Sequence, residues 1–171
     1  LSDAGAVIVN WGTAFGLTHA GSLLFTPESL GGSDEADGRF GYALAAGDFN
    51  GDGEDDLAIG QPGYDLGGGV QDIGHVWIVI GHPSAFGGTV ITRFQSDAGG
   101  SNEAGDEFGA ALVAGDFNGD GYDDLAVGAP GEDAGAGAVF QFLGSVFGPI
   151  VDGGWFKQST LGGANDPGDR F

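Results

Sequence analysis

The sequence contains no cysteine, no methionine and few basic residues. Lysine and arginine together number 4, against 25 aspartates and glutamates, which gives a formal net charge of −21. This imbalance argues against a nucleic-acid partner, because too few cations are present to neutralise phosphates. Without cysteine there is no disulfide, no zinc–thiolate site and no cysteine nucleophile. Because the excess negative charge opposes folding by self-repulsion, cations are the first partners to consider.

Long apolar runs and glycosylation sequons are missing as well. No stretch approaches the length of a transmembrane helix, so we expect no membrane insertion by this chain, and no basic segment precedes an apolar one as in a retained signal peptide. The absence of methionine indicates a chain that is processed or is a piece of something longer. The lack of N-x-[ST] sequons and of cysteine is compatible with a bacterial protein.

The sequence does contain an internal repeat. Residues 40–107 begin FGYALAAGDFNGDGEDDLAIGQPG and align with residues 108–170, which begin FGAALVAGDFNGDGYDDLAVGAPG. A third, incomplete copy precedes them, because GAVIVNWG, from Gly5 to Gly12, matches GHVWIVIG and GAVFQFLG. The chain is therefore expected to hold the second half of one unit, with its outer two strands and a connector, followed by two full units: residues 1–40, 41–107 and 108–171.

Each full unit is predicted to form four short strands. Apolar and β-branched runs bounded by Gly, Asp, Asn and Pro are typical of strands, and no stretch has helical periodicity. The strands are expected at residues 42–49, 56–60, 75–81, 89–95, 111–117, 124–128, 138–144 and near 155–161.

The apolar pattern indicates how such units are arranged. VIVNW and VWIVI are nearly continuous in apolar residues, which predicts strands that are buried on both faces. Four-stranded units covered on both faces and repeated along the chain are typical of a β-propeller. We therefore predict an all-β fold of propeller blades, each with four antiparallel strands and about two and a half of them in this chain, an incomplete propeller. A sandwich or a β-solenoid is the alternative.

Each full unit carries a DFNGDG turn with the spacing of a calcium loop. In such loops, side-chain oxygens at positions 1, 3 and 5 converge on one ion, glycine at position 6 allows the turn, and position 7 supplies its backbone carbonyl. An EF-hand has Glu at position 12, where this chain has Ile59 or Val127, so position 9 must supply the closing ligand. The predicted ligands of the two Ca²⁺ sites are Asp48, Asn50, Asp52, Glu54 and Asp56, and Asp116, Asn118, Asp120, Tyr122 and Asp124.

The DFNGDG turns have two alternative interpretations, a metal-free turn and a magnesium site. The simpler alternative is a turn rich in Asp and Gly that holds no metal. Magnesium suits the loop less well, because it demands octahedral geometry and retains waters. The neighbouring Asp55 and Asp123 are expected to tune the local charge and not to bind an ion directly.

These motifs resemble FG-GAP repeats, the units of the seven-bladed propeller in integrin α subunits. The resemblance rests on the two DFNGDG turns and on the FG and GQP or GAP motifs at residues 40–41, 60–62, 108–109 and 128–130. It implies calcium at the ten residues named above and an extracellular or cell-surface setting. Two and a half units do not close a propeller of that size, so the edge from Gly5 to Gly12 is expected to be covered by further blades of a parent chain, another subunit or a second copy.

Catalytic signatures are sparse. The three histidines do not recur at equivalent repeat positions, and no G-x-S-x-G motif is present. The acidic connectors recur with each unit as structural features do, and are interpreted as solvated loop residues: Asp34, Glu35, Asp37, Glu103, Asp106 and Asp169.

The predicted function is that of a non-catalytic, calcium-binding propeller segment. It would serve outside the cell as an adhesion-like interaction or structural module with a protein or carbohydrate ligand. The alternative is an accessory propeller part of a secreted hydrolase or lyase that degrades polysaccharide or lipid.

Overall fold

The computed structural model describes residues 4–82, 88–149, 151–164 and 166–170, which form three antiparallel β-sheets. The first sheet has two strands, and the other two have four strands each, in which neighbours in sequence are neighbours in the sheet. The first sheet contains β1 (Val7–Thr13) and β2 (Gly16–Phe25). The second contains β3 (Leu44–Gly47), β4 (Asp56–Gln61), β5 (His75–Ile80) and β6 (Thr89–Arg93). The third contains β7 (Ala111–Gly115), β8 (Asp124–Ala129), β9 (Ala138–Leu143) and β10 (Val151–Lys157).

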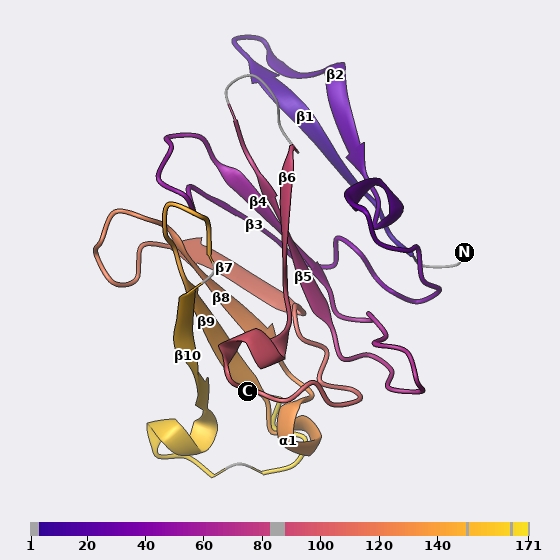
Figure 1. The fold of residues 1–171 in the computed structure, drawn as a ribbon, viewed down its shortest axis with the longest axis vertical. Helices are drawn as coiled ribbons and strands as arrows, with labels where there is room; N and C mark the ends of the chain where they lie inside the picture. Colours follow the sequence, from indigo (N-terminus) through magenta and orange to yellow (C-terminus); the bar gives the residue numbers. More distant parts are fainter. Residues whose placement is uncertain (1–3, 83–87, 150, 165, 171) are drawn as a thin grey trace.

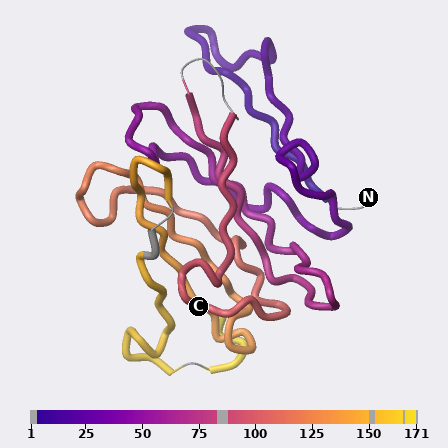
Figure 2. The backbone as a smooth tube through the Cα atoms, in the orientation of Figure 1, coloured from indigo at the N-terminus to yellow at the C-terminus, as the bar shows by residue number. Residues whose placement is uncertain are grey.

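The three sheets are arranged as an open fan (Figure 1). The backbone passes from one sheet to the next in sequence order, and within the described residues the sheets do not close into a ring (Figure 2). The predicted all-β fold of four-stranded propeller blades, incomplete within this chain, is therefore confirmed.

Short helical turns follow the outer strand of every sheet. They are η1 (Glu28–Leu30), η2 (Gln95–Ala98) and η3 (Gln158–Leu161), and one further turn, α1 (Glu132–Gly135), follows β8. The strands expected at 89–95 and near 155–161 therefore end earlier, at Arg93 and Lys157. The Asp97 carboxylate accepts the Phe94 N–H at 2.9 Å, a local bond that competes with strand pairing. No helix within the described segments is long and apolar enough to cross a membrane.

The apolar core lies between consecutive sheets. One cluster joins the second and third sheets, and includes Val76 and Ile78 of β5 and Phe140 and Phe142 of β9. A smaller cluster joins the first and second sheets. The same link is made at both junctions, because Phe40 N–H donates to Ala4 O at 3.0 Å and Phe108 N–H donates to Ile73 O at 3.1 Å. The units therefore repeat in their contacts as well as in their sequence.

The prediction that the VIVNW and VWIVI strands are buried on both faces is right for β5 and wrong for β1. Five of the six residues of β5 are buried. In β1, Val7 is buried on the second sheet together with Phe25, but Ile8 is 63% exposed. The reason is that β5 lies inside a four-stranded sheet between two others, whereas β1 pairs only with β2 among the described residues.

His75 of β5 is buried in an aromatic environment. Its ring stacks on Phe94 at 4.6 Å and contacts Tyr64 and Trp77, with ring centroids at 4.8 and 4.5 Å. Neither ring nitrogen has a hydrogen-bond partner. Burial lowers the pKa of His75 from its usual 6.5 to about 3, so the ring is neutral at physiological pH.

His75→Phe is expected to reduce the loss of stability on acidification. The folded pKa lies below the unfolded value, so the unfolded chain binds the extra proton and stability falls as pH drops below about 6.5. Between pH 7 and pH 5 this histidine contributes a loss of about 2 kcal/mol, which the phenylalanine variant avoids. Urea unfolding of both proteins at the two pH values measures the difference. Equal losses in wild type and variant would contradict a buried neutral histidine.

Candidate functional site

The two DFNGDG segments form the turns between β3 and β4 and between β7 and β8. The last paired residues below the turns are Gly47 with Asp56 and Gly115 with Asp124. Both turns project from the same side of the fan (Figure 1). The repeat therefore places the two candidate metal loops at equivalent ends of neighbouring sheets.

In the first loop, the side-chain oxygens of positions 1, 3 and 5 face the backbone of the turn. Asp48 accepts the N–H groups of Asp52 and Gly53 at 3.0 and 2.9 Å. Asn50 Oδ1 accepts Asp52 N–H at 2.8 Å. Asp52 Oδ1 accepts Glu54 N–H at 2.9 Å. These bonds hold three oxygen-bearing side chains together in one turn.

The second loop repeats this pattern. Asp116 accepts the N–H groups of Asp120 and Gly121 at 3.1 and 3.0 Å, and Asn118 Oδ1 accepts Asp120 N–H at 2.8 Å. Asp120 Oδ1 accepts Tyr122 N–H at 3.0 Å. The backbone donors, that of Gly121 foremost, lower the pKa of Asp116 below its usual value, so its charged form is favoured.

The residue at position 9 lies at the buried base of each loop. Asp56 accepts Gly81 N–H at 2.8 Å and Phe49 N–H at 3.1 Å, which ties the loop to the end of β5. Asp124 accepts the equivalent pair of N–H groups at 3.0 and 2.8 Å. Burial raises the pKa of Asp56 to about 6 despite these bonds. A bound cation would offset the cost of keeping this carboxylate ionised.

The donor set of the two loops fits a hard cation. Carboxylate, amide and backbone carbonyl oxygens are the ligands that Ca²⁺ prefers, and each loop offers all three kinds. At position 7 of the second loop, Tyr122 offers only its backbone carbonyl, because its ring lies beside Gly51 of the first loop. A methyl group added at Gly51 of the first loop would lie 2.6 Å from that ring.

The two loops are linked directly, which the sequence did not predict. Asp123 Oδ2 accepts the Asp48 N–H at 2.9 Å, and the Asp123 N–H donates to Asp48 O at 3.0 Å. Asp123 therefore joins neighbouring sheets and does more than tune charge. Its counterpart Asp55 is exposed. The two aspartates occupy the same repeat position, so the sequence alone does not show which of them joins neighbouring sheets.

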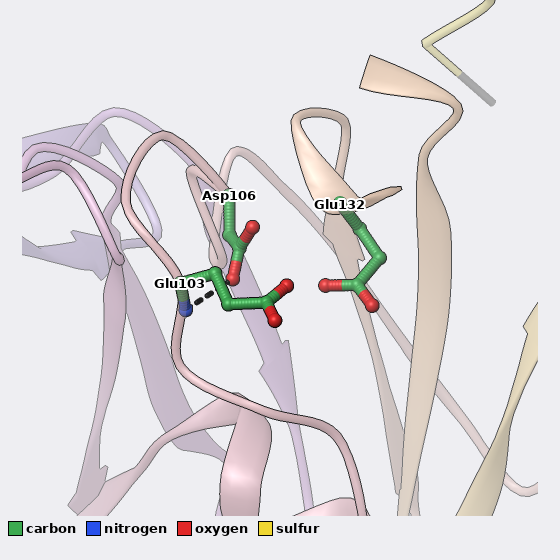
Figure 3. A group of neighbouring side chains, drawn as sticks. All are labelled: Glu103, Asp106 and Glu132. Carbon is green, nitrogen blue, oxygen red and sulfur yellow. Dashed lines mark hydrogen bonds between the residues drawn. The ribbon is translucent and has the colours of Figure 1, made fainter. Parts of the chain in front are cut away.

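The acidic connectors are not all solvated. Asp106 is buried, so its interpretation as a solvated loop residue is wrong. It lies near Glu103 and Glu132, and one carboxylate oxygen from each lies within 4.8 Å of the others (Figure 3). We call these three residues the acidic cluster. Glu132 was missed because it stands alone after the GAP motif, at a position where the first full unit, residues 41–107, has Tyr64.

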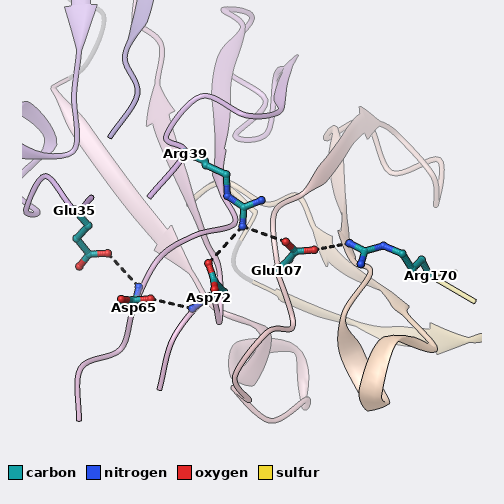
Figure 4. Close-up of polar contacts among 6 residues, drawn as sticks. All are labelled: Glu35, Arg39, Asp65, Asp72, Glu107 and Arg170. Carbon is teal, nitrogen blue, oxygen red and sulfur yellow. Dashed lines mark hydrogen bonds and ion pairs between the residues drawn. The ribbon is translucent and has the colours of Figure 1, made fainter. Parts of the chain in front are cut away.

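A chain of charged residues runs across the three connectors (Figure 4). Arg39, Glu107 and Arg170 occupy the same repeat position, and Glu107 accepts hydrogen bonds from Arg39 at 3.1 Å and Arg170 at 2.5 Å. Arg39 also contacts Asp72 at 3.5 Å. The three repeat-equivalent residues line one pocket, so the connectors converge on a common region of the fan.

Glu107→Gln is expected to destabilise the chain by about 1 kcal/mol or less at low ionic strength. The three side chains are partly exposed, and solvent and salt weaken ion pairs of this kind. The difference in the free energy of unfolding between wild type and variant is expected to disappear near 1 M NaCl. Urea unfolding at low and high salt measures it, and Glu28→Gln is the charge-matched control. A loss above 2 kcal/mol that salt does not change would contradict this assignment.

Comparison with known proteins places these features in a family. The model of the FG-GAP repeat matches residues 40–79 and 108–140. The chain is 44% identical over 119 residues to integrin alpha-PS2 of Drosophila melanogaster, covering 66% of this chain and 8% of that protein. It is 34% identical over 153 residues to integrin alpha-5 of Xenopus laevis, covering 77% of this chain and 14% of that protein.

Enzymes are similar to this chain as well. Phosphatidylinositol-glycan-specific phospholipase D of Rattus norvegicus is 39% identical over 114 residues, covering 63% of this chain and 13% of the enzyme. The chain thus spans only a small part of these relatives. The two matched repeats, their four-stranded sheets and the similarity to integrin α subunits show that this chain belongs to the FG-GAP repeat family of β-propellers.

Proposed function

We propose that this chain is a calcium-binding segment of an FG-GAP propeller that serves as an adhesion-type interaction module. The observation that carries the proposal is the matching geometry of the two hairpin loops. In both loops the side-chain oxygens of positions 1, 3 and 5 accept hydrogen bonds from equivalent backbone N–H groups of the turn. Each turn thereby gathers several oxygen ligands within one short loop, as a calcium site requires.

Each loop is proposed to hold one Ca²⁺. The ligands are the side chains at positions 1, 3, 5 and 9 and the carbonyl at position 7: Asp48, Asn50, Asp52, Glu54 and Asp56, and Asp116, Asn118, Asp120, Tyr122 and Asp124. The ion would neutralise carboxylates that repel one another in a chain of net charge −21. Because Asp123 joins the two loops, order in one loop supports order in the other.

The predicted units, residues 1–40, 41–107 and 108–171, are proposed to pack against further blades. Phe49 and Phe117 occupy the same position of identical hexapeptides, yet Phe49 is fully buried and Phe117 is 49% exposed. Phe49 is covered because its loop contacts the third sheet. The exposed Phe117 and the exposed face of β1 are surfaces of the kind that a neighbouring blade covers, whether from the same chain or from another subunit.

Counting bound calcium tests the proposal. Asp48→Asn and Asp116→Asn are each expected to remove one ion per chain, because each variant removes the charged ligand at position 1 of one loop. Isothermal titration with CaCl₂ gives the count, and Asp55→Asn is the matched control. Unchanged counts in both variants would overturn calcium binding at the hairpin loops.

An extracellular or cell-surface setting is proposed with this function. It is supported by the similarity to integrin α subunits and by the oxygen ligands of the two loops. Extracellular calcium modules bind the ion with Kd values of roughly 10⁻⁴–10⁻³ M, so they need the high calcium concentration found outside cells. A protein ligand is favoured by the same relatives, whereas a carbohydrate ligand and a bacterial source stay predictions.

The second candidate function is an accessory propeller of a secreted lipid-degrading hydrolase. The similarity to phosphatidylinositol-glycan-specific phospholipase D favours it. We expect this chain alone to release no glycosylphosphatidylinositol-anchored alkaline phosphatase from membranes, with the phospholipase as positive control. Release by the chain would overturn its assignment as non-catalytic.

A further inference from the structure

The turns between the third and the outer strand of each unit share a four-residue motif that the proposed function does not use. The motif is TAFG at residues 13–16 and SVFG at residues 145–148, and it recurs as SAFG at residues 84–87, which lie outside the described segments. The first turn joins β1 to β2, and the last joins β9 to β10. A phenylalanine followed by glycine thus stands in all three turns.

The two described turns have the same local structure. In the β1–β2 turn, Thr13 Oγ1 accepts the Phe15 N–H at 3.2 Å and donates to the carbonyl of the following glycine at 2.6 Å. In the β9–β10 turn, Ser145 Oγ accepts the Phe147 N–H at 3.3 Å and donates to the carbonyl of the following glycine at 2.9 Å. The two glycines have φ values of 109° and 90°, a region that favours glycine. The hydroxyl and the glycine therefore build the turn, and no bond of the turn needs the phenylalanine ring.

Both phenylalanines are presented to solvent. Phe15 is fully exposed and Phe147 is 72% exposed. Their apolar neighbours Leu17 and Val146 are 78% and 63% exposed. Residues 12–18 and 144–149 contain no Asp, Glu, Lys or Arg, in a chain with 25 aspartates and glutamates. Each turn therefore forms an uncharged apolar tip, and we call residues 13–17 and 145–148 the phenylalanine tips.

Neighbouring sheets do not cover the phenylalanine tips. The β9–β10 turn is held on the second sheet, which precedes it, because Arg93 Nε donates to Pro149 O at 3.0 Å, yet Phe147 is exposed. The β1–β2 hairpin is followed by the second sheet, and Phe15 is exposed as well. Phe49 shows the contrast, since packing between the second and third sheets buries it fully. A sheet before or after the unit is therefore not what covers this position.

The phenylalanine tips lie at the same end of the fan as the two DFNGDG loops (Figure 1). The β9–β10 tip is attached to both loops, because Ser145 N–H donates to Phe49 O at 3.1 Å and Gly144 N–H donates to Asp124 Oδ1 at 2.8 Å. Calcium in the loops would reduce the negative charge beside the tips, and in this respect the inference rests on the proposed function. This end of the chain therefore combines apolar tips with the two candidate metal loops.

A lipid surface suits apolar tips of this kind. The two described tips belong to different sheets, so a protein partner would need a separate apolar pocket for each, whereas the interface of a bilayer accepts apolar side chains without a matching shape. An anionic bilayer would repel a chain of net charge −21, which favours a zwitterionic lipid. We propose that Phe15 and Phe147 anchor this chain reversibly to the surface of a zwitterionic phospholipid bilayer. The attachment is peripheral, and no segment spans the membrane.

Flotation of the whole chain with phosphatidylcholine vesicles in CaCl₂ tests this anchor. Wild type is expected to float with the vesicles, and Phe15→Ala/Phe147→Ala is expected to partition at least about tenfold less, because the affinity for the interface scales with the apolar area buried there. Leu66→Ala is the control, since Leu66 is exposed but lies between β4 and β5, outside the tips. In Phe147→Trp, the fluorescence added by the new indole is expected to shift to the blue on vesicles and to be quenched by brominated phosphatidylcholine.

The outcomes separate the membrane anchor from the calcium loops. Vesicle binding that the double phenylalanine variant loses supports the anchor, even if calcium titration finds no bound ion. A chain that binds calcium but no vesicles would overturn the anchor and leave the calcium proposal standing. Vesicle binding that the double variant retains would overturn it too. Self-association of wild type that the double variant loses, measured by sedimentation velocity in the absence of any vesicle binding, would overturn it in favour of a second copy of this chain.

Discussion

Removal of calcium is expected to lower the melting temperature of this chain by roughly 10–20 °C. An ion at about 100 times its Kd stabilises the folded state by about 2.7 kcal/mol, so two hairpin ions contribute about 5 kcal/mol. For a chain of this size, each kcal/mol shifts the melting temperature by roughly 2–4 °C. Circular dichroism melts in saturating CaCl₂ and after exhaustive chelation measure the shift.

The matched control for this melt is the double variant Asp48→Asn/Asp116→Asn, which should lose most of the calcium-dependent shift. Magnesium at the same concentration is expected to restore less stability than calcium, since the loops offer flexible oxygen ligands and not a rigid octahedron. Identical melts of the wild type with and without calcium would contradict structural calcium at the loops.

Phe140→Ala is expected to destabilise the chain by about 3–5 kcal/mol. Phe140 of β9 is fully buried, meets Phe108 edge-on with ring centroids at 5.6 Å, and stacks on Trp155 at 5.6 Å. Truncation removes these contacts and leaves a cavity in the junction between the second and third sheets. Urea unfolding in saturating calcium measures the loss.

Phe147→Ala serves as the control for the core variant. Phe147 is 72% exposed, and its truncation is expected to change stability by no more than about 0.5 kcal/mol. A loss below 1 kcal/mol for Phe140→Ala would contradict a core formed between neighbouring sheets.

The strands and the metal loops were predictable because their signals are local. Short apolar runs between glycine-rich turns predicted the strands from β3 to β9 to within a few residues, and the spacing of the DFNGDG turn predicted which oxygens share a loop. Hydrogen bonds within the turn depend on residues two to five positions apart, so the sequence order carries that information.

Contacts between sheets were not predictable, because they depend on what lies beside each unit. The two DFNGDG segments are identical, but Phe49 is covered by the third sheet, whereas Phe117 is 49% exposed among the residues that the structure describes. The exposure of β1, the hydrogen bond between Asp48 and Asp123 and the burial of Asp106 were not predicted for the same reason. In each case the deciding contact joins segments far apart in the sequence.

The most direct test of the account is an anomalous difference map from crystals grown in CaCl₂. The account predicts one strong peak in each hairpin loop, surrounded by the oxygens of Asp48, Asn50 and Asp52 in the first and of Asp116, Asn118 and Asp120 in the second. Loops that retain their hydrogen bonds but show no anomalous peak at saturating calcium would contradict the central claim that these turns are calcium sites.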